Sequence, residues 1–254
     1  MLLQATVGGI ETKIHNKKTA TALYIIYNNM VRENLEHIKA TLPQQTRLVA
    51  VSKTKPVEML QEAYDAGQRA FGENKALEMR DKHEALPKDI EWHFIGHLQT
   101  NKIKYIIGYV SLIHSIDSLN LLQAVEKEAA KHDRVVNCLL QFHIASEETK
   151  FGLDMAEAEE LMNHIGEMSH VRIVGVMGMA TNTDDKEQVR REFRTLHNIF
   201  DRLKKKYFAG DEGFKEISMG MSHDYEIAVE EGSTLVRVGS SIFGARDYGV
   251  KVND

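Results

Sequence analysis

The sequence predicts an α/β protein, a single (β/α)8 TIM barrel in which eight parallel strands alternate with helices. Three observations support this fold. Eight short apolar runs, typical of buried parallel strands, alternate with helical patterns along the chain. No linker, repeat or low-complexity tract divides the sequence, and its 254 residues suit one barrel. An open doubly wound sheet stays an alternative, but eight units in this length favour closure.

The predicted strands are apolar runs bounded by polar or turn-forming residues, and they lie at residues 48–53, 69–74, 91–96, 111–115, 135–144, 171–176, 214–218 and 234–238. The predicted helices carry apolar residues three or four positions apart, and they lie at residues 31–42, 57–66, 75–85, 98–107, 119–125, 154–165, 189–203, 222–231 and 241–245. Local signals mark several helix ends. Pro43 stops the first helix, Ser118 can cap the fifth, and Asp154 with Glu157 forms a capping pair.

Composition restricts the classes of partner. A formal net charge of −5 and an isoelectric point near 6.2 argue against nucleic acid and anionic membranes as ligands. No apolar stretch approaches the ~20 residues that span a bilayer. The single cysteine, Cys138, lies in an apolar run and is predicted to be a buried thiol, which suits the reducing cytoplasm. Residues 1–29 show little periodicity, so we expect a disordered extension before a barrel domain at 30–254, with Met30 as a candidate translation start.

Lys53 is the residue around which the predicted site is organised. Side chains alternate along a strand, so Val49, Val51 and Lys53 point the same way. If that direction is the interior of the barrel, Lys53 is the last inward residue at the carboxyl end of the strand. Lys55 falls in the turn that follows. Lys53 itself has two interpretations: a solvated or ion-paired lysine, or an amine desolvated enough to form a Schiff base with an aldehyde or ketone.

The loops after the seventh and eighth predicted strands, at 218–223 and 238–241, combine glycine, serine and the start of a helix. In such barrels these two loops often hold phosphate. Arg237, on the eighth strand, is either half of a salt bridge or a permanent donor to a ligand. Together with Lys53 these features describe a site for an aldehyde that bears a phosphate. Pyridoxal phosphate is the first candidate, and a phosphorylated sugar in a Schiff-base aldolase is the second. No metal site is predicted, because the histidines form neither a helix pair with a carboxylate nor a Cys/His cluster.

Five longer motifs stand in order along the chain: AVSKTKP at 50–56, FGEN at 71–74, WHFIGHLQTNK at 92–102, SMGMSHD at 218–224 and GSTLVRVGSSIFGARDY at 232–248. With them, the stretch from residue 30 to 248 resembles the pyridoxal phosphate homeostasis family, whose fold is similar to the fold-type III barrel of the alanine racemase N-terminal domain. The resemblance implies that Lys53 carries pyridoxal 5'-phosphate (PLP) as a Schiff base and that Arg237 faces the pyridine nitrogen. It also implies cofactor contacts, near Asn74 and around the phosphate at Ser218, Ser222, Gly239 and Ser240.

The resemblance implies a monomeric carrier that binds and releases PLP for client enzymes and has no established reaction. An arginine at the ring nitrogen keeps that nitrogen unprotonated, which makes the ring a weak electron sink. No second acid–base group is marked, since Tyr225 and Tyr248 lie near the site by position only. A fold-type III amino-acid racemase or lyase is the alternative, and an interaction module acting on cofactor-dependent enzymes is a third. Histidines 93, 97 and 114 are expected to be capped or core residues rather than catalytic ones.

Overall fold

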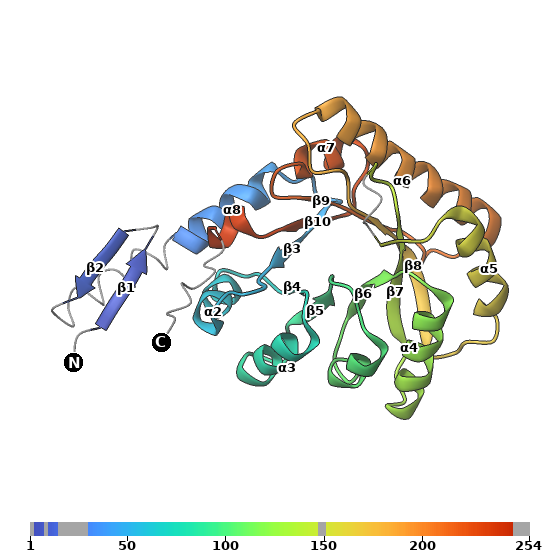
Figure 1. The fold of residues 1–254 in the computed structure, drawn as a ribbon, viewed down its shortest axis with the longest axis horizontal. Coiled ribbons are helices and arrows are strands. Elements are labelled where there is room, and N and C mark those ends of the chain that lie inside the picture. The colour runs from blue at the N-terminus through green and yellow to red at the C-terminus, as the bar shows by residue number, and fades with distance from the viewer. Residues whose placement is uncertain (1–2, 8–9, 15–29, 147–150, 246–254) are drawn as a thin grey trace.

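Eight parallel strands close into a barrel in the computed structural model, which describes residues 3–7, 10–14, 30–146 and 151–245 (Figure 1). The strands are β3 (Arg47–Val51), β4 (Ala70–Glu73), β5 (Glu91–Phe94), β6 (Leu112–Ile116), β7 (Val136–Phe142), β8 (Val171–Gly178), β9 (Glu216–Met221) and β10 (Leu235–Val238). Neighbours in the sequence are neighbours in the barrel, and β10 pairs with β3 to close it. The predicted (β/α)8 barrel is confirmed.

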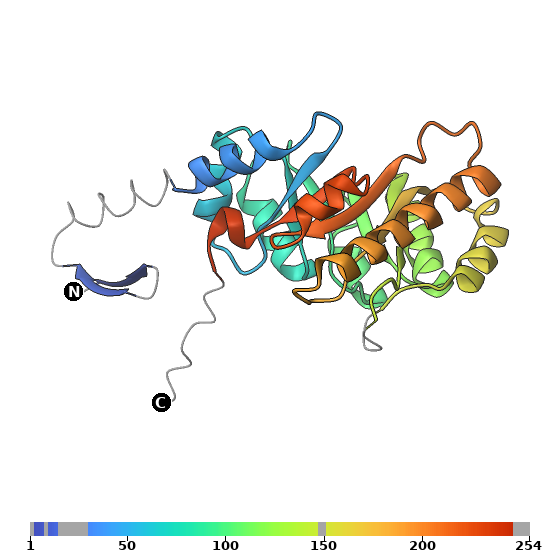
Figure 2. The same cartoon turned by 90° about the horizontal axis from the view of Figure 1, so that it is seen from above.

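Helices surround the strands (Figures 1 and 2). They are an unlabelled helix at residues 30–41, α2 (Val57–Asp65), α3 (Ala76–Ala85), α4 (Leu119–Lys131), α5 (Met155–Ile165), α6 (Lys186–Tyr207), α7 (Tyr225–Glu230), α8 (Ser240–Phe243) and the 3-10 helix η1 (Thr100–Tyr105). The caps expected at Ser118 and at Asp154 with Glu157 are present as hydrogen bonds. The helix expected at 98–107 is instead a short 3-10 helix, a tighter form that is used in short connections.

The alternation of side chains along the strands separates two apolar clusters. One cluster joins strands from across the sheet and therefore fills the inside of the barrel; it comprises Val49, Leu112, Leu139, Val174, Met177 and Leu235. The larger cluster lies between the strands and the helices and includes Cys138. Cys138 is fully buried, as predicted, and burial raises the pKa of its thiol. The closure is reinforced across β10, where Arg47 of β3 donates to Glu216 of β9 at 2.8 Å.

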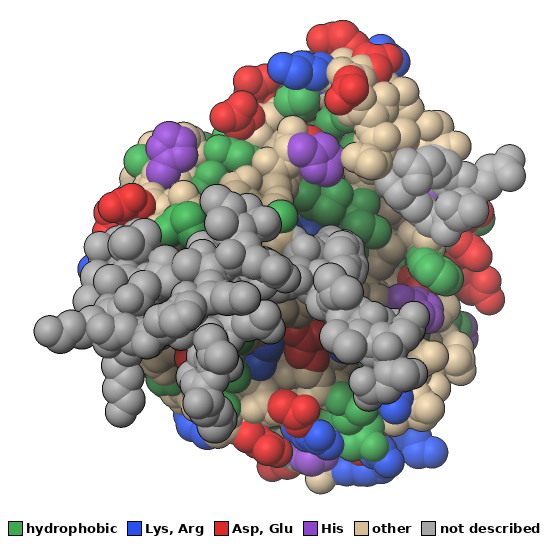
Figure 3. Space-filling model, turned by 60° about the vertical axis from the view of Figure 1, so that its left-hand side comes forward, with side chains coloured by type: hydrophobic (Ala, Val, Ile, Leu, Met, Phe, Trp, Pro, Cys, Tyr) green, Lys and Arg blue, Asp and Glu red, His purple; other side chains and the backbone are tan. Residues whose placement is uncertain are grey.

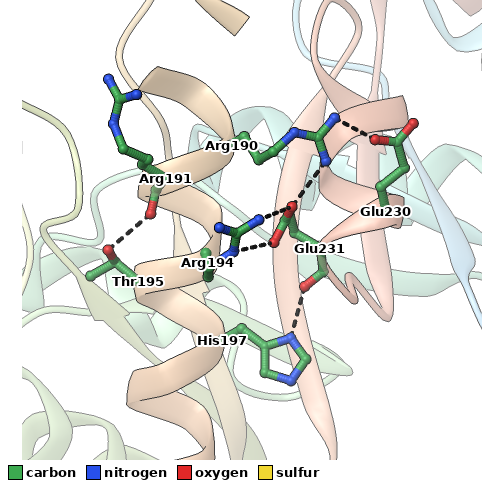
Figure 4. Close-up of polar contacts among 7 residues, drawn as sticks. All are labelled: Arg190, Arg191, Arg194, Thr195, His197, Glu230 and Glu231. Atoms are coloured by element: carbon green, nitrogen blue, oxygen red, sulfur yellow. Dashed lines mark hydrogen bonds and ion pairs between the residues drawn. The ribbon is translucent and has the colours of Figure 1, made fainter. Parts of the chain in front are cut away.

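The long helix α6 is fixed to the connection between β9 and β10 (Figure 4). Arg190 and Arg194 both donate to the carboxylate of Glu231, at 2.9 and 3.0 Å. His197 contacts the Glu231 carbonyl at 2.7 Å, and Arg190 also pairs with Glu230. These contacts hold α7 and the segment that follows it, and so position the two loops in which a phosphate site is expected.

Residues before the barrel form a separate element. Strands β1 (Leu3–Val7) and β2 (Ile10–Ile14) pair with each other in antiparallel fashion and make a sheet of their own. We expected no regular structure in residues 1–29, so the pairing of β1 with β2 differs from that expectation. Residues 1–2, 8–9 and 15–29 lie outside the described part, so the disordered extension stays a prediction.

Charged side chains of both signs are interspersed on the face drawn in Figure 3. Among the described residues, none of the helices combines the length and the apolar character needed to cross a membrane.

Candidate functional site

A cavity of about 390 Å³ opens at the carboxyl ends of the strands. Six of the seven residues predicted for the site line it, namely Lys53, Asn74, Ser222, Arg237, Gly239 and Ser240. The other lining residues are Val51, Lys55, Ile95, Met179, Met221, His223 and Gly244. The fold thus brings residues that are far apart in the sequence to one mouth of the barrel, the location at which (β/α)8 barrels carry their sites.

Lys53 and Lys55 have different environments, as the sequence predicted. The strand β3 ends at Val51, two residues earlier than expected, so Lys53 stands in the turn rather than at the last strand position. Its half-buried side chain lines the cavity. The Lys55 ammonium donates to the carbonyl oxygens of Phe243, Gly244 and Ala245 at 2.9, 3.1 and 2.7 Å. Lys55 therefore holds the end of α8, whereas Lys53 stays the sequence's candidate for chemistry.

Arg237 is a buried cation whose contacts are neutral. Its side chain is 4% exposed, and it donates from Nη1 to the Ser218 hydroxyl at 2.6 Å and from Nη2 to the Gly178 carbonyl at 3.1 Å. Burial lowers its pKa to about 10, so the group stays protonated at neutral pH. No carboxylate among the described residues forms an ion pair with it. The described residues therefore offer Arg237 no salt bridge, and it has further guanidinium N–H groups beyond those that donate to Ser218 and Gly178.

Ser218 lies below Arg237 and does not line the cavity, which corrects the expectation that it surrounds a phosphate. It is fully buried, and its hydroxyl contacts Nδ1 of His114 at 2.9 Å; His114 Nε2 in turn contacts Nδ1 of His93 at 2.9 Å. Burial lowers the pKa of His93 to about 3 and that of His114 well below its ordinary value, so both rings are neutral. Both are core residues, as predicted. His97 is instead exposed and contacts Asp117.

The predicted phosphate loops meet on one side of the cavity. The Gly239 N–H donates to the Ser222 hydroxyl oxygen at 3.1 Å, which leaves the hydroxyl hydrogen of Ser222 available to a ligand. A Cβ at Gly239 would stand 2.9 Å from the Val51 carbonyl oxygen, so only glycine allows this turn to approach β3 so closely. Ser240, the first residue of α8, completes this wall.

Asn74, which follows β4, brings an unpaired acceptor to the cavity. Its amide oxygen Oδ1 is buried and has no hydrogen-bond partner among the described residues. Leaving such an atom unpaired costs free energy unless a ligand supplies a donor. A Cβ at Gly96 would lie 2.4 Å from the Asn74 carbonyl oxygen, so the loop after β5 approaches Asn74 closely because residue 96 is glycine.

Sequence reasoning did not predict three apolar residues that line the cavity, nor the histidine His223. Ile95, Met179 and Met221 lie at the ends of β5, β8 and β9, and only their positions at strand ends could have identified them. His223 also lines the cavity and contacts Asp224 at 3.3 Å. The hydroxyl of Tyr225 contacts Thr41 at 3.2 Å and does not line the cavity; Tyr248 lies outside the described residues.

Fold and cavity together define a (β/α)8 protein whose cavity at the strand ends is lined by lysine, a buried arginine and a glycine–serine turn. The family described as alanine racemase, N-terminal domain, matches residues 26–247. A pyridoxal phosphate homeostasis protein of Aquifex aeolicus is 42% identical over 203 residues, which are 80% of this chain and 88% of that protein. One from Escherichia coli K12 is 38% identical over 213 residues, 82% of this chain and 89% of its own. The chain belongs to the alanine racemase N-terminal domain family, together with these homeostasis proteins.

A solved structure agrees with this assignment. PipY of Synechococcus elongatus, solved with PLP bound, superposes with a TM-score of 0.76 at 32% sequence identity. The match covers 84% of this chain and 100% of PipY.

Proposed function

We propose that this protein binds PLP in the cavity at the strand ends and holds it as a Schiff base on Lys53. One observation carries the proposal. Arg237, a buried cation with no ion-pair partner among the described residues, opens onto the same cavity as Lys53. A buried charge without a direct ion pair is costly, and an electron-rich ligand atom offsets part of that cost.

The residues of the cavity suit each part of PLP. The cofactor supplies an aldehyde, which condenses with a lysine amine and releases water. The Ser222 hydroxyl and the turn at Gly239 and Ser240 offer donors and close backbone approach to a phosphate. Arg237 can donate to the ring nitrogen. The apolar side chains of Ile95, Met179 and Met221, with Val51, suit the faces of an aromatic ring.

We further propose that the protein is a carrier rather than an enzyme. Curated relatives bear the name pyridoxal phosphate homeostasis protein, and PipY was solved with PLP. A guanidinium at the ring nitrogen does not release its proton, so the bound ring is a poor sink for electrons. On this proposal the protein stores PLP in the cytoplasm as a monomer and releases it to client enzymes. The buried thiol of Cys138 supports a reducing compartment.

An amino-acid racemase or lyase is the second candidate, because His223 lines the cavity and could act as an acid–base group. Turnover of D- or L-amino acids by pure protein, lost in both Lys53→Ala and His223→Gln, would establish the enzyme and contradict the carrier.

The test of PLP binding is an absorbance spectrum before and after borohydride reduction. The wild type should show a visible band that reduction fixes onto the peptide containing Lys53, and Lys53→Ala should show none. Lys55→Arg is the matched control, because arginine can still donate to the α8 carbonyls but does not form a Schiff base. Absence of the band in wild type with added PLP would refute the lysine assignment.

A further inference from the structure

The turn that carries Lys53 is fixed on both sides by side chains from the β4–α3 unit. The Ser52 hydroxyl donates to Glu73 Oε1 at 2.7 Å. The backbone N–H of Thr54 donates to Glu78 Oε1 at 2.5 Å. The residues before and after Lys53 are therefore each bound to a carboxylate from the neighbouring unit of the barrel.

A buried lysine joins these two contacts. The Lys82 ammonium donates to Glu73 Oε1 and to Glu78 Oε1, both at 2.7 Å, and to the Ser52 carbonyl at 2.8 Å. Lys82 is 5% exposed and Glu73 is fully buried. All three ammonium hydrogens have an acceptor. A buried ion pair seldom adds net stability, so its better-founded role is to fix one arrangement of the chain.

The conformation of the turn shows why it needs external support. Thr54 has a φ of +64°, in the left-handed region that β-branched residues rarely adopt. Such a backbone persists only where surrounding contacts impose it. The bond from Thr54 N–H to Glu78 is a contact of this kind, and it acts one residue away from Lys53.

We propose that Glu78, Lys82 and Glu73 are positioning residues that hold the 52–54 turn so that the Lys53 amine faces the cavity before PLP arrives. None of the three is among the described residues that line the cavity, so they act through the turn. The inference rests on the proposed function and adds to it. A lysine already in place loses less conformational freedom on binding, which tightens affinity.

The experiment compares Glu78→Ala with Glu78→Gln. The Glu78 side chain is 22% exposed, so its replacement spares the core. Glutamine keeps an acceptor for Thr54 and Lys82, whereas alanine removes it. We expect Glu78→Ala to raise the Kd for PLP about tenfold, and Glu78→Gln to stay within about twofold of wild type. Equal Kd values for wild type and Glu78→Ala would overturn the inference, as would equal losses in both variants.

A measurement without cofactor separates this inference from the proposed function. Amide hydrogen exchange of Thr54 in the PLP-free protein should be at least about tenfold faster in Glu78→Ala than in wild type and unchanged in Glu78→Gln. Unchanged exchange in Glu78→Ala would refute the positioning role. If the wild type binds no PLP, the proposed function fails, and Thr54 exchange still decides whether Glu78 holds the turn.

The double variant Glu73→Gln with Lys82→Met provides a second test should Glu78→Ala fail to fold. It replaces the two buried ions by neutral groups of similar size, and the Glu78 carboxylate, which loses its ammonium partner, is 22% exposed and keeps the Thr54 N–H. We expect it to fold and to bind PLP about tenfold more weakly. Wild-type affinity in this folded variant would overturn the inference.

Discussion

Arg237 contacts groups that orient it without neutralising it. The Ser218 hydroxyl and the Gly178 carbonyl accept from its two terminal nitrogens, and the histidines behind Ser218 are uncharged. The guanidinium is therefore held in one direction without a direct ion pair among the described residues, although the carboxylate of Asp224 acts on its charge through space. At the scale of single residues, this arrangement favours a ligand with an electron-rich atom in the cavity.

Two serine-to-alanine variants should distinguish the serine that orients Arg237 from the serine proposed to contact PLP. Ser218→Ala leaves Arg237 Nη1 and His114 Nδ1 without their shared partner, so we expect the free energy of unfolding to fall by about 1–3 kcal/mol. Ser222→Ala, at the cavity wall, should cost less than about 1 kcal/mol yet weaken PLP affinity several-fold. Urea unfolding and absorbance titration measure the two effects. Equal stability losses would contradict the separation.

The buried histidines should make stability depend on pH. The pKa of His93 is about 3 in the folded protein, against an ordinary value of 6.5 in the unfolded chain. Below pH 6.5 the unfolded chain takes up a proton that the folded protein does not. The stability contributed by a neutral His93 is thus complete above pH 6.5 and is lost as the pH falls toward 3.

We expect His93→Gln to remove this dependence. Between pH 6.5 and 5.5 the wild type should lose about 1 kcal/mol more than His93→Gln, since one pKa unit corresponds to about 1.4 kcal/mol. Urea unfolding at pH 5.5, 6.5 and 7.5 measures the difference. If stability depends on pH equally in both proteins, then folding does not lower the pKa of His93 and the ring takes up a proton in the folded protein as well.

At the scale of elements, the turn between β10 and α8 should not tolerate a larger residue than glycine. A Cβ at Gly239 would stand 2.9 Å from the Val51 carbonyl oxygen, so Gly239→Ala should push the turn away from β3. We expect a loss of about 1–3 kcal/mol in stability and weaker PLP binding. Gly166→Ala is the control, because its Cβ would meet no atom within 4 Å. Wild-type affinity in Gly239→Ala would show that close approach is not required.

Periodicity located the strands well and their ends poorly. The seventh strand was predicted to end at Ser218, whereas β9 continues to Met221. At about 3.3 Å per residue, Ser218 therefore lies some 10 Å deeper than a strand-end residue would, which places it under Arg237. The 3-10 form of η1 and the hairpin of β1 with β2 were also missed, because short elements with mixed composition carry little periodic signal.

At the scale of the whole molecule, eight alternating units were enough to predict closure, because parallel strands need helical crossovers and right-handed crossovers lead to few folds. The cavity was predictable only in part. Lys53, Arg237 and Gly239 stand out as residue types at strand ends, but Met179 and Ile95 resemble any apolar core residue. They line the cavity because the closed barrel brings the ends of its strands together, and a local sequence pattern contains no information about that arrangement.

We predict that the barrel folds independently of the segment that precedes it. Strands β1 and β2 pair with each other, and none of their residues lines the described cavity. We expect a chain that starts at Met30 to unfold within about 2 °C of the full-length Tm and to bind PLP with the same Kd. A chain that starts at Pro43 is the control. It lacks the buried side chains of Val31, Leu35 and Ile38, so it should lose more than about 4 kcal/mol. If the chain that starts at Met30 also loses stability, or binds PLP more weakly, then residues 1–29 belong to the folded domain. The barrel and its cavity would then be incomplete without them.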